Sequence, residues 1–169
     1  MKNRKAEPEL RLINMEDVAV ELVEWLLYPF IPYGKVTIIQ GDPGEGKTTM
    51  VLQIIAKLTK GKPVLSVKDG EEEPAENVGE PVNVIFQTAE DGLGDTIKPR
   101  LLSAGADCSK VLVIDDSEQP LTMLDERLEQ AIRQTNARLV VLDPIQSFLG
   151  AEVDMHRANE IRPLMKRVS

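Results

Sequence analysis

Four short runs of apolar residues stand out along the chain, and none of them alternates cleanly between polar and apolar positions. Strands covered on both faces have such continuous apolar runs, which is typical of a parallel sheet with helices outside it. The pattern therefore predicts four buried strands. They are 35–39 (KVTII), 82–86 (VNVIF), 110–114 (KVLVI) and 138–142 (RLVVL).

Apolar residues recur at helical spacing between these runs. The first predicted helix follows Lys47, and Gly61 and Pro63 end it. Strands that alternate with helices predict an α/β layered fold. The other predicted helices are a stripe from Leu124 to Ile132, opened by Thr122 with Asp125 three residues later, a helix from Asp95 to Ala104, and a stretch from about Asp154 to the C-terminus.

The stretch GDPGEGKTT, residues 41–49, lies between the first predicted strand and the first predicted helix. It matches the phosphate-loop pattern G-x-x-x-x-G-K-[ST], in which glycines let successive backbone N–H groups point at phosphate oxygens. The helix N-terminus adds partial positive charge. We therefore expect a nucleotide site formed by Gly41, Pro43, Gly44, Glu45, Gly46, Lys47, Thr48 and Thr49.

Within this loop, individual side chains have different expected roles. Lys47 can reach the β- and γ-phosphates, and the Thr48 hydroxyl can ligate Mg²⁺. Thr49 is a weaker candidate, for the α-phosphate, and it is equally well read as an ordinary helix residue. The motif thus predicts ATP and Mg²⁺ as the ligands.

Asp143 ends the apolar run RLVVL and precedes Pro144. Ligands of open α/β sheets bind at the carboxyl ends of strands, so this carboxylate is a candidate Mg²⁺ ligand, directly or through water. The alternative is an aspartate that starts a turn before proline. Asp115 ends its run in a similar way, but no motif follows it, and we expect only a turn or a cap there.

A pair of acids, Glu90 and Asp91, follows the second apolar run. If that strand lies beside the phosphate-loop strand, Glu90 reaches the γ-phosphate region and can polarise the attacking water. We expect Asp91 to cap the helix that begins near Asp95. The alternative is that both acids merely cap that helix, because negative charge near a helix N-terminus is stabilising.

Length and composition restrict the class of protein. The chain has 169 residues, 42% of them hydrophobic, which is enough for one domain with a core. Its single cysteine, Cys108, excludes an internal disulfide and fits a reducing cytoplasm. The most apolar window, VEWLLYPFIPYG, is too short and too broken by Glu24 and prolines to span a bilayer. We expect a cytoplasmic protein without a membrane partner.

The net charge is −8, from 28 acidic and 20 basic residues. This balance argues against a broad basic face for nucleic acid, but it leaves a local basic groove open, or one shared between subunits. The segment 66–81 is acidic and rich in glycine and proline, which predicts a solvated surface excursion. We expect residues 1–33 to lead into a core of residues 34–169.

Three motifs follow one another in the chain: GDPGEGKTT, then QTAED with Arg-Leu about ten residues later, then RLVVLDPIQSFLG. Together they resemble the RecA-like ATPases. The similarity is greatest to RepA-type hexameric replicative helicases and to the ATPase parts of phage or mobile-element primase–helicases. Many families share the phosphate loop, whereas the acid pair followed by Arg-Leu is more specific.

The resemblance implies a RecA-like P-loop core and a role for each motif. Glu90 matches the catalytic glutamate, Asp143 the metal-side aspartate, and Arg100 an arginine that stacks on adenine, although a solvated helix arginine fits Arg100 equally well. The segment after Asp143, up to about 162, matches loops that face a DNA channel, and it includes His156 and Arg157. Such cores continue with further strands, a sensor residue and often an arginine finger, so we expect the core to be incomplete at Ser169.

The sequence thus favours Mg²⁺-dependent ATP hydrolysis by a motor domain of a DNA replication helicase or primase–helicase. The implied partners are single-stranded DNA and further copies of the chain in a ring. Two alternatives stay open. One is a nucleotide or metabolite kinase, although no basic cluster resembles a kinase lid. The other is a non-catalytic module that binds ATP and changes partners.

Overall fold

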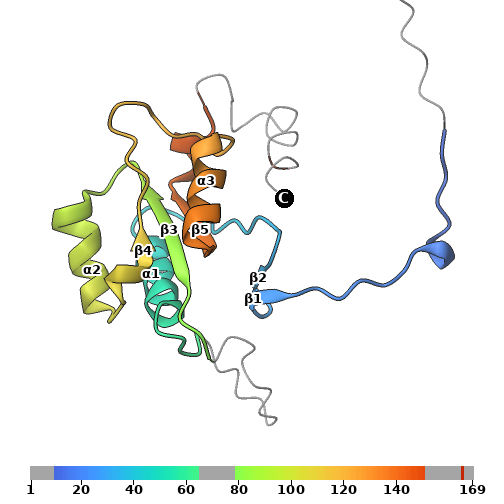
Figure 1. Cartoon of the computed structure of the whole chain (residues 1–169), viewed down its shortest axis with the longest axis horizontal. Coiled ribbons are helices and arrows are strands. Elements are labelled where there is room, and N and C mark those ends of the chain that lie inside the picture. The colour runs from blue at the N-terminus through green and yellow to red at the C-terminus, as the bar shows by residue number, and fades with distance from the viewer. Residues whose placement is uncertain (1–9, 65–78, 151–164, 166–169) are drawn as a thin grey trace, which may run out of the picture.

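The computed structural model describes residues 10–64, 79–150 and 165. At its centre is a parallel sheet in the order β4–β3–β5 (Figure 1). These strands are β3 (Asn83–Thr88), β4 (Val111–Leu112) and β5 (Ala137–Asp143). The predicted α/β fold, a mostly parallel sheet flanked by helices, is confirmed, and three of the four predicted strands form.

The fourth predicted strand, residues 35–39, does not form. No secondary structure is assigned there, and Ile38 is 60% exposed. A strand exists only where a neighbouring strand accepts and donates its backbone hydrogen bonds. In the described part of the chain the neighbours of β3 are β4 and β5. The predicted strand at residues 35–39 was therefore wrong, and the condition set for Glu90, that the phosphate-loop segment lies beside β3, is not met among the described strands.

Among the described residues, three α-helices flank the sheet (Figure 1): α1 (Lys47–Leu58), α2 (Lys98–Ser103) and α3 (Glu126–Thr135). A π-helical turn, η2 (Leu93–Ile97), leads directly into α2, so the predicted helix at Asp95 begins two residues earlier. Short 3₁₀ turns are η3 (Cys108–Lys110) and η4 (Ile145–Phe148). The predicted helix beyond Asp154 and most of the 66–81 segment lie outside the described residues; Met165 is helical.

The N-cap of α3 is Asp125, not Thr122. Its carboxylate accepts hydrogen bonds from the backbone N–H of Arg127 (2.9 Å) and from the Arg127 guanidinium. The guanidinium also donates to the carbonyls of Gln119 and Pro120, which ties the preceding loop to the helix. Asp125 immediately precedes the first helical residue, so its side chain satisfies a free N–H group of the first turn, whereas Thr122 lies three residues further from the helix.

The main core lies between the sheet and two helices. Buried side chains of α1 (Leu52, Ile55), β3 (Val84, Phe86) and α2 (Leu101) contact one another. Each side chain of this size stabilises the fold by roughly 1.5–3 kcal/mol when removed from water. This cluster therefore holds the start of α1, and with it the phosphate loop, against the strand that precedes Glu90.

Residues 10–32 are not part of the central sheet. They contain a 3₁₀ turn, η1 (Met15–Asp17), and a small antiparallel hairpin of β1 (Trp25–Leu27) and β2 (Ile31–Pro32). The hairpin buries Leu26 and Leu27, whereas the chain before it extends away from the body (Figure 1). None of the helices that the structure describes has the length and apolar character needed to cross a bilayer.

The Asp125 cap generates a prediction about stability and pH. Asp125→Ala should lower the free energy of unfolding at pH 7 by about 1 kcal/mol, as for a lost N-cap. Hydrogen bonds from the Arg127 side chain, and then from its backbone, hold the pKa of Asp125 below its usual value. The contribution is therefore present above the unfolded pKa of about 3.9 and is lost as pH falls through the folded pKa.

Urea unfolding of the parent and of Asp125→Ala, at pH 7 and at about pH 3, measures the difference in their free energy of unfolding. Glu129→Ala is the control, because the exposed pair of Glu129 with Arg133 on the same helix contributes only about 0.3–0.5 kcal/mol. A stability difference for Asp125→Ala that did not shrink in acid would contradict the role of the carboxylate.

Candidate functional site

The phosphate loop is an exposed turn at the N-terminus of α1. Gly44 and Gly46 have φ values of +84° and +82°, a left-handed conformation that side-chain-bearing residues rarely adopt. Gly46 is the N-cap of α1, so the free N–H groups of the first helical turn follow it directly. The loop that carries the motif therefore has a backbone conformation suited to binding an anion.

Lys47 is the first residue of α1, and its side chain folds back over the loop. Its ammonium group donates to the carbonyls of Gly41 (2.9 Å) and Asp42 (2.8 Å). On the same loop, the Glu45 carboxylate accepts a hydrogen bond from the N–H of Asp42 (2.8 Å). The lysine is therefore held at the mouth of the loop by weak carbonyl acceptors, which a phosphate oxygen can replace as the stronger, charged partner.

Thr48 and Asp143 come from distant parts of the chain and meet at the site. The Thr48 hydroxyl donates to a carboxylate oxygen of Asp143 at 2.7 Å. Asp143 is the last residue of β5 and is half-buried. A hydroxyl and a carboxylate are hard oxygen donors, and Mg²⁺ is held in proteins by one or two such groups together with waters and substrate phosphates. The two residues fit the predicted Mg²⁺ site.

Within the described residues there is no cluster of three or more His, Cys, Asp or Glu side chains that could hold a metal ion alone.

Glu90 lies at the same edge of the sheet as Asp143, but not as the last residue of its strand. β3 ends at Thr88, which is in register with Asp143 of β5. The next N–H, of Ala89, donates to the Asp143 carbonyl (3.2 Å). Glu90 follows immediately and is exposed. Its neighbour across the sheet is thus the Asp143 strand, and not the phosphate-loop segment.

Asp91 does not cap a helix, contrary to the prediction. The N-cap of η2 is Gly92, and no side chain caps it. The N–H of Asp91 donates to the Thr88 hydroxyl (3.2 Å), and its carboxylate lies 3.7 Å from the guanidinium of Arg100 on α2. Asp91 therefore pairs with Arg100, whereas Glu90 is exposed to solvent.

Two residues at the end of β3 escaped the sequence analysis. Gln87 is buried, and its amide both donates to the carbonyl of Ile114 (3.2 Å) and accepts from its N–H (2.6 Å). Thr88 accepts the bond from Asp91 described above. A glutamine directly after an apolar run was the available signal, since a buried amide needs partners for both of its ends.

Other predicted residues lie apart from this site. Asp115 accepts a hydrogen bond from the N–H of Ser117, which caps the local chain as expected. Hydrogen bonds from the Ser117 side chain, and then from its backbone, lower the pKa of Asp115. Thr49 is exposed on the first turn of α1. His156 and Arg157 lie outside the described residues, so the predicted DNA-facing segment is described only as far as Gly150.

A glycine-rich loop at the start of a helix, beside the carboxyl ends of parallel strands, defines the class of P-loop nucleotide-binding α/β proteins. A family model described as an AAA domain matches residues 5–169. The chain therefore belongs to the AAA domain family of P-loop ATPases. Neither the curated proteins nor the solved structures include a match to it.

The loop conformation generates a second prediction. A methyl group at Gly46 would meet no atom within 4 Å, so Gly46→Ala tests backbone strain alone. We expect it to lower the free energy of unfolding by about 1–2 kcal/mol, the cost of a left-handed residue with a Cβ. Gly94→Ala, which also meets open space but lies in the helical turn η2, should stabilise by about 0.4–1 kcal/mol. Urea unfolding measures the free energy of unfolding of both variants. Equal changes in the two would contradict a left-handed constraint at Gly46.

Proposed function

We propose that the chain binds Mg²⁺-ATP at residues 41–49 and hydrolyses it. The observation that carries this proposal is the 2.7 Å contact between the Thr48 hydroxyl and the Asp143 carboxylate, directly beside the phosphate loop. It joins a phosphate-binding turn to the end of a parallel strand, which is where α/β proteins bind nucleotides. Membership of a P-loop ATPase family supports the same chemistry.

The residues of the loop would hold the nucleotide in distinct ways. Backbone N–H groups from Gly44 to Thr48 surround the phosphates, and the Lys47 ammonium leaves the carbonyls of Gly41 and Asp42 for the β- and γ-phosphate oxygens. Thr48 and Asp143 supply oxygen ligands for Mg²⁺. An ion held by these two groups would supply positive charge that offsets the charge of the phosphates.

Glu90 is the proposed catalytic base. It follows Ala89, whose N–H is bonded to the Asp143 carbonyl, and it is exposed at that edge of the sheet. There it would accept a proton from the water that attacks the γ-phosphate. A kinase transfers the phosphoryl group to a bound acceptor and does not need such a base, so Glu90 favours hydrolysis.

Arg100 is the proposed contact for the adenine base. Its side chain is half exposed, and its only described ion pair, with Asp91, is 3.7 Å long. An exposed pair of this kind contributes about 0–1 kcal/mol, so it would not prevent the guanidinium from stacking on a base.

We further propose that this ATPase is the motor of a DNA replication helicase or primase–helicase, acting as a ring on single-stranded DNA. The support is the resemblance carried by the three motifs in order. Residues 34–169 would form the ATPase core, and residues 1–33 an N-terminal segment that packs on the core or leads into it. A net charge of −8 disfavours phosphate backbones, so DNA would bind in a channel shared between copies. Stimulation of ATP turnover by single-stranded DNA, measured against salt, tests this role.

Binding of the nucleotide is tested by Lys47→Ala. The variant should bind Mg²⁺-ATP about 10- to 100-fold more weakly, because a hydrogen bond to a charged group contributes about 1.5–3 kcal/mol. Titration calorimetry measures the affinity. Lys57→Ala, an exposed lysine at the other end of the same helix, is the control and should bind as the parent does. Equal affinity of Lys47→Ala and the parent would exclude residues 41–49 as the ATP site.

Catalysis is tested by Glu90→Gln, which keeps the shape but removes the basic carboxylate. Steady-state ATPase activity, without any added acceptor, should fall by roughly 10²–10⁴-fold. ATP affinity should be retained or rise, since a negative charge near the γ-phosphate is lost. Asp91→Asn should retain turnover within about tenfold, since the Asp91 carboxylate faces Arg100. The reverse ranking of the two variants would mean that Asp91 is the base, and tight binding without turnover in the parent would favour the regulatory module.

A further inference from the structure

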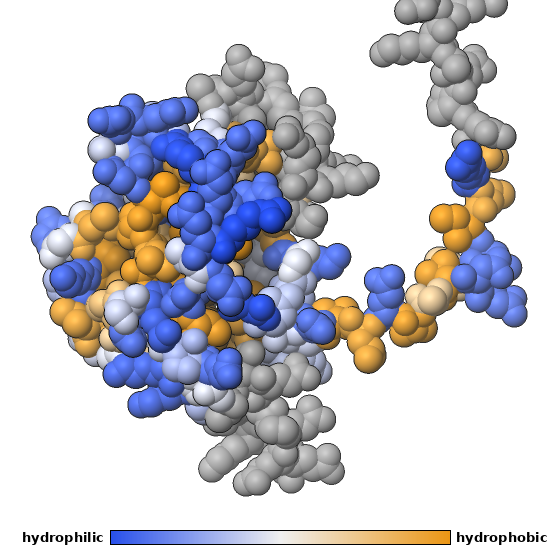
Figure 2. All heavy atoms as spheres, in the orientation of Figure 1, coloured by the Kyte–Doolittle hydropathy of each residue, from blue (hydrophilic) through white to orange (hydrophobic). Residues whose placement is uncertain are grey.

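The N-terminal arm, defined as residues 10–24, exposes an unusual amount of apolar surface. Val20 and Leu22 are 94% and 95% exposed, and Leu10, Leu12, Ile13 and Met15 are also largely in water. Figure 2 shows this apolar surface along the arm, away from the body. Soluble monomers rarely leave such contiguous apolar surface uncovered. The arm therefore needs a binding surface.

Part of the arm has the pattern of a strand. Val18, Val20 and Leu22 are spaced by two, and no helix is assigned between Val18 and Glu24. In an extended chain, residues spaced by two share one side, so these three side chains form an apolar edge. Such a segment suits a binding mode in which a strand adds to the free edge of a sheet.

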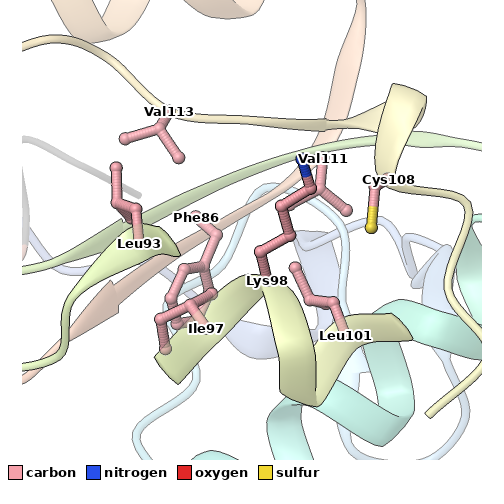
Figure 3. Close-up of a pocket in the computed structure, with 8 residues that line it drawn as sticks. All are labelled: Phe86, Leu93, Ile97, Lys98, Leu101, Cys108, Val111 and Val113. Carbon is pink, nitrogen blue, oxygen red and sulfur yellow. The ribbon is translucent and has the colours of Figure 1, made fainter. Parts of the chain in front are cut away.

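The body offers a surface of the matching kind, here named the α2–β4 groove. It is a hollow of about 230 Å³ between η2–α2 and the β4 edge. Phe86, Ile97 and Leu101 are buried at its floor, whereas Leu93 and Val113 are 47% and 42% exposed at one end (Figure 3). Small-molecule pockets measure about 300–1,000 Å³, so this hollow suits one or two side chains of a peptide better.

β4 has a free edge beside this groove. It is the outermost strand of the described sheet, with β3 on its inner side. Gln87 of β3 holds both the N–H and the C=O of Ile114. Because peptide groups of an extended chain point alternately to its two sides, those of Val113 face away from β3. An incoming strand would find backbone partners there and apolar contacts in the groove.

Charge on the two surfaces is complementary. Glu24 shares the side of the arm that carries Val20 and Leu22, since it too has an even position in the extended segment. Lys98 lies along the groove (Figure 3). Lys110 is in the turn η3, which adjoins β4. Over residues 10–24 the arm carries four carboxylates and one guanidinium. The acidic arm and the lysines of the groove would favour one orientation of binding.

The arm does not reach the groove of its own chain. It leaves the body at β1, on the side opposite to α2 and β4 (Figure 1). From these observations we propose that residues 18–24 of one copy of the chain add as a strand to the free edge of β4 in a second copy, with Val20 and Leu22 in the α2–β4 groove. This contact is head-to-tail, so repetition generates a ring or a filament. It gives the proposed ring a contact between copies, and it does not rest on ATP hydrolysis.

The first test is self-association of the full chain by sedimentation velocity over a range of concentrations. The parent should associate, and Val20→Asp/Leu22→Asp should raise the dissociation constant at least tenfold, because two carboxylates cannot enter an apolar groove. Leu10→Asp/Leu12→Asp is the matched control, with the same spacing, exposure and added charge outside the docking strand. Both substituted pairs are exposed, so folding is unaffected. A monomeric parent, or equal effects of the two variants, would overturn the proposal.

The second test uses Cys108, which lines the groove and is the one cysteine of the chain. Leu22→Cys and Val20→Cys, made separately, should form covalent dimers and higher species with a short thiol–thiol cross-linker. Adding Cys108→Ser to each variant should abolish these species. Cross-linking within one chain, seen as a monomer of altered mobility, would show that the arm folds back on its own groove. That result, or no cross-link with Cys108 in either variant, would exclude the second copy as the partner.

Discussion

The parallel pairing of β3 with β5 determines the geometry of the whole site. It places Thr88 in register with Asp143 and lets the N–H of Ala89 bond to the Asp143 carbonyl. Because both strands end at one edge, the acid that follows β3 and the acid that ends β5 lie on the same side of the sheet. The 2.7 Å bond from Thr48 then attaches the start of α1 to that edge. A shift of one residue in this register would turn Asp143 to the other face.

The core supports this arrangement from below. Side chains of α1 pack on Val84 and Phe86 of β3, so the helix that presents the phosphate loop cannot slide relative to the strand that leads to Glu90. On the other side of β3, Gln87 holds the chain beyond β4 through two hydrogen bonds. Catalytic geometry must be held to fractions of an ångström, and packed helices and paired strands provide that rigidity better than loops do.

The same sheet also leaves two strand edges uncovered in the described part of the chain. Both outer strands of the described sheet have a free edge, and free edges accept added strands unless they are covered. The groove beside β4 and the N-terminal arm both expose apolar side chains, which water solvates poorly. A contact between copies would cover both and would place each ATP site in a defined position relative to the next subunit.

The sequence alone determined the features that depend on local chemistry. The phosphate loop, the helix after Lys47 and three strands could be read from residue spacing, because glycine conformation and apolar periodicity act over a few residues. Tertiary structure decided the features that depend on contacts with distant parts of the chain. Residues 35–39 have the composition of a strand but no strand beside them, and Asp91 binds Arg100 where a local cap was expected. The meeting of Thr48 with Asp143, 95 positions apart, follows from the order of strands in the sheet, which no local pattern specifies.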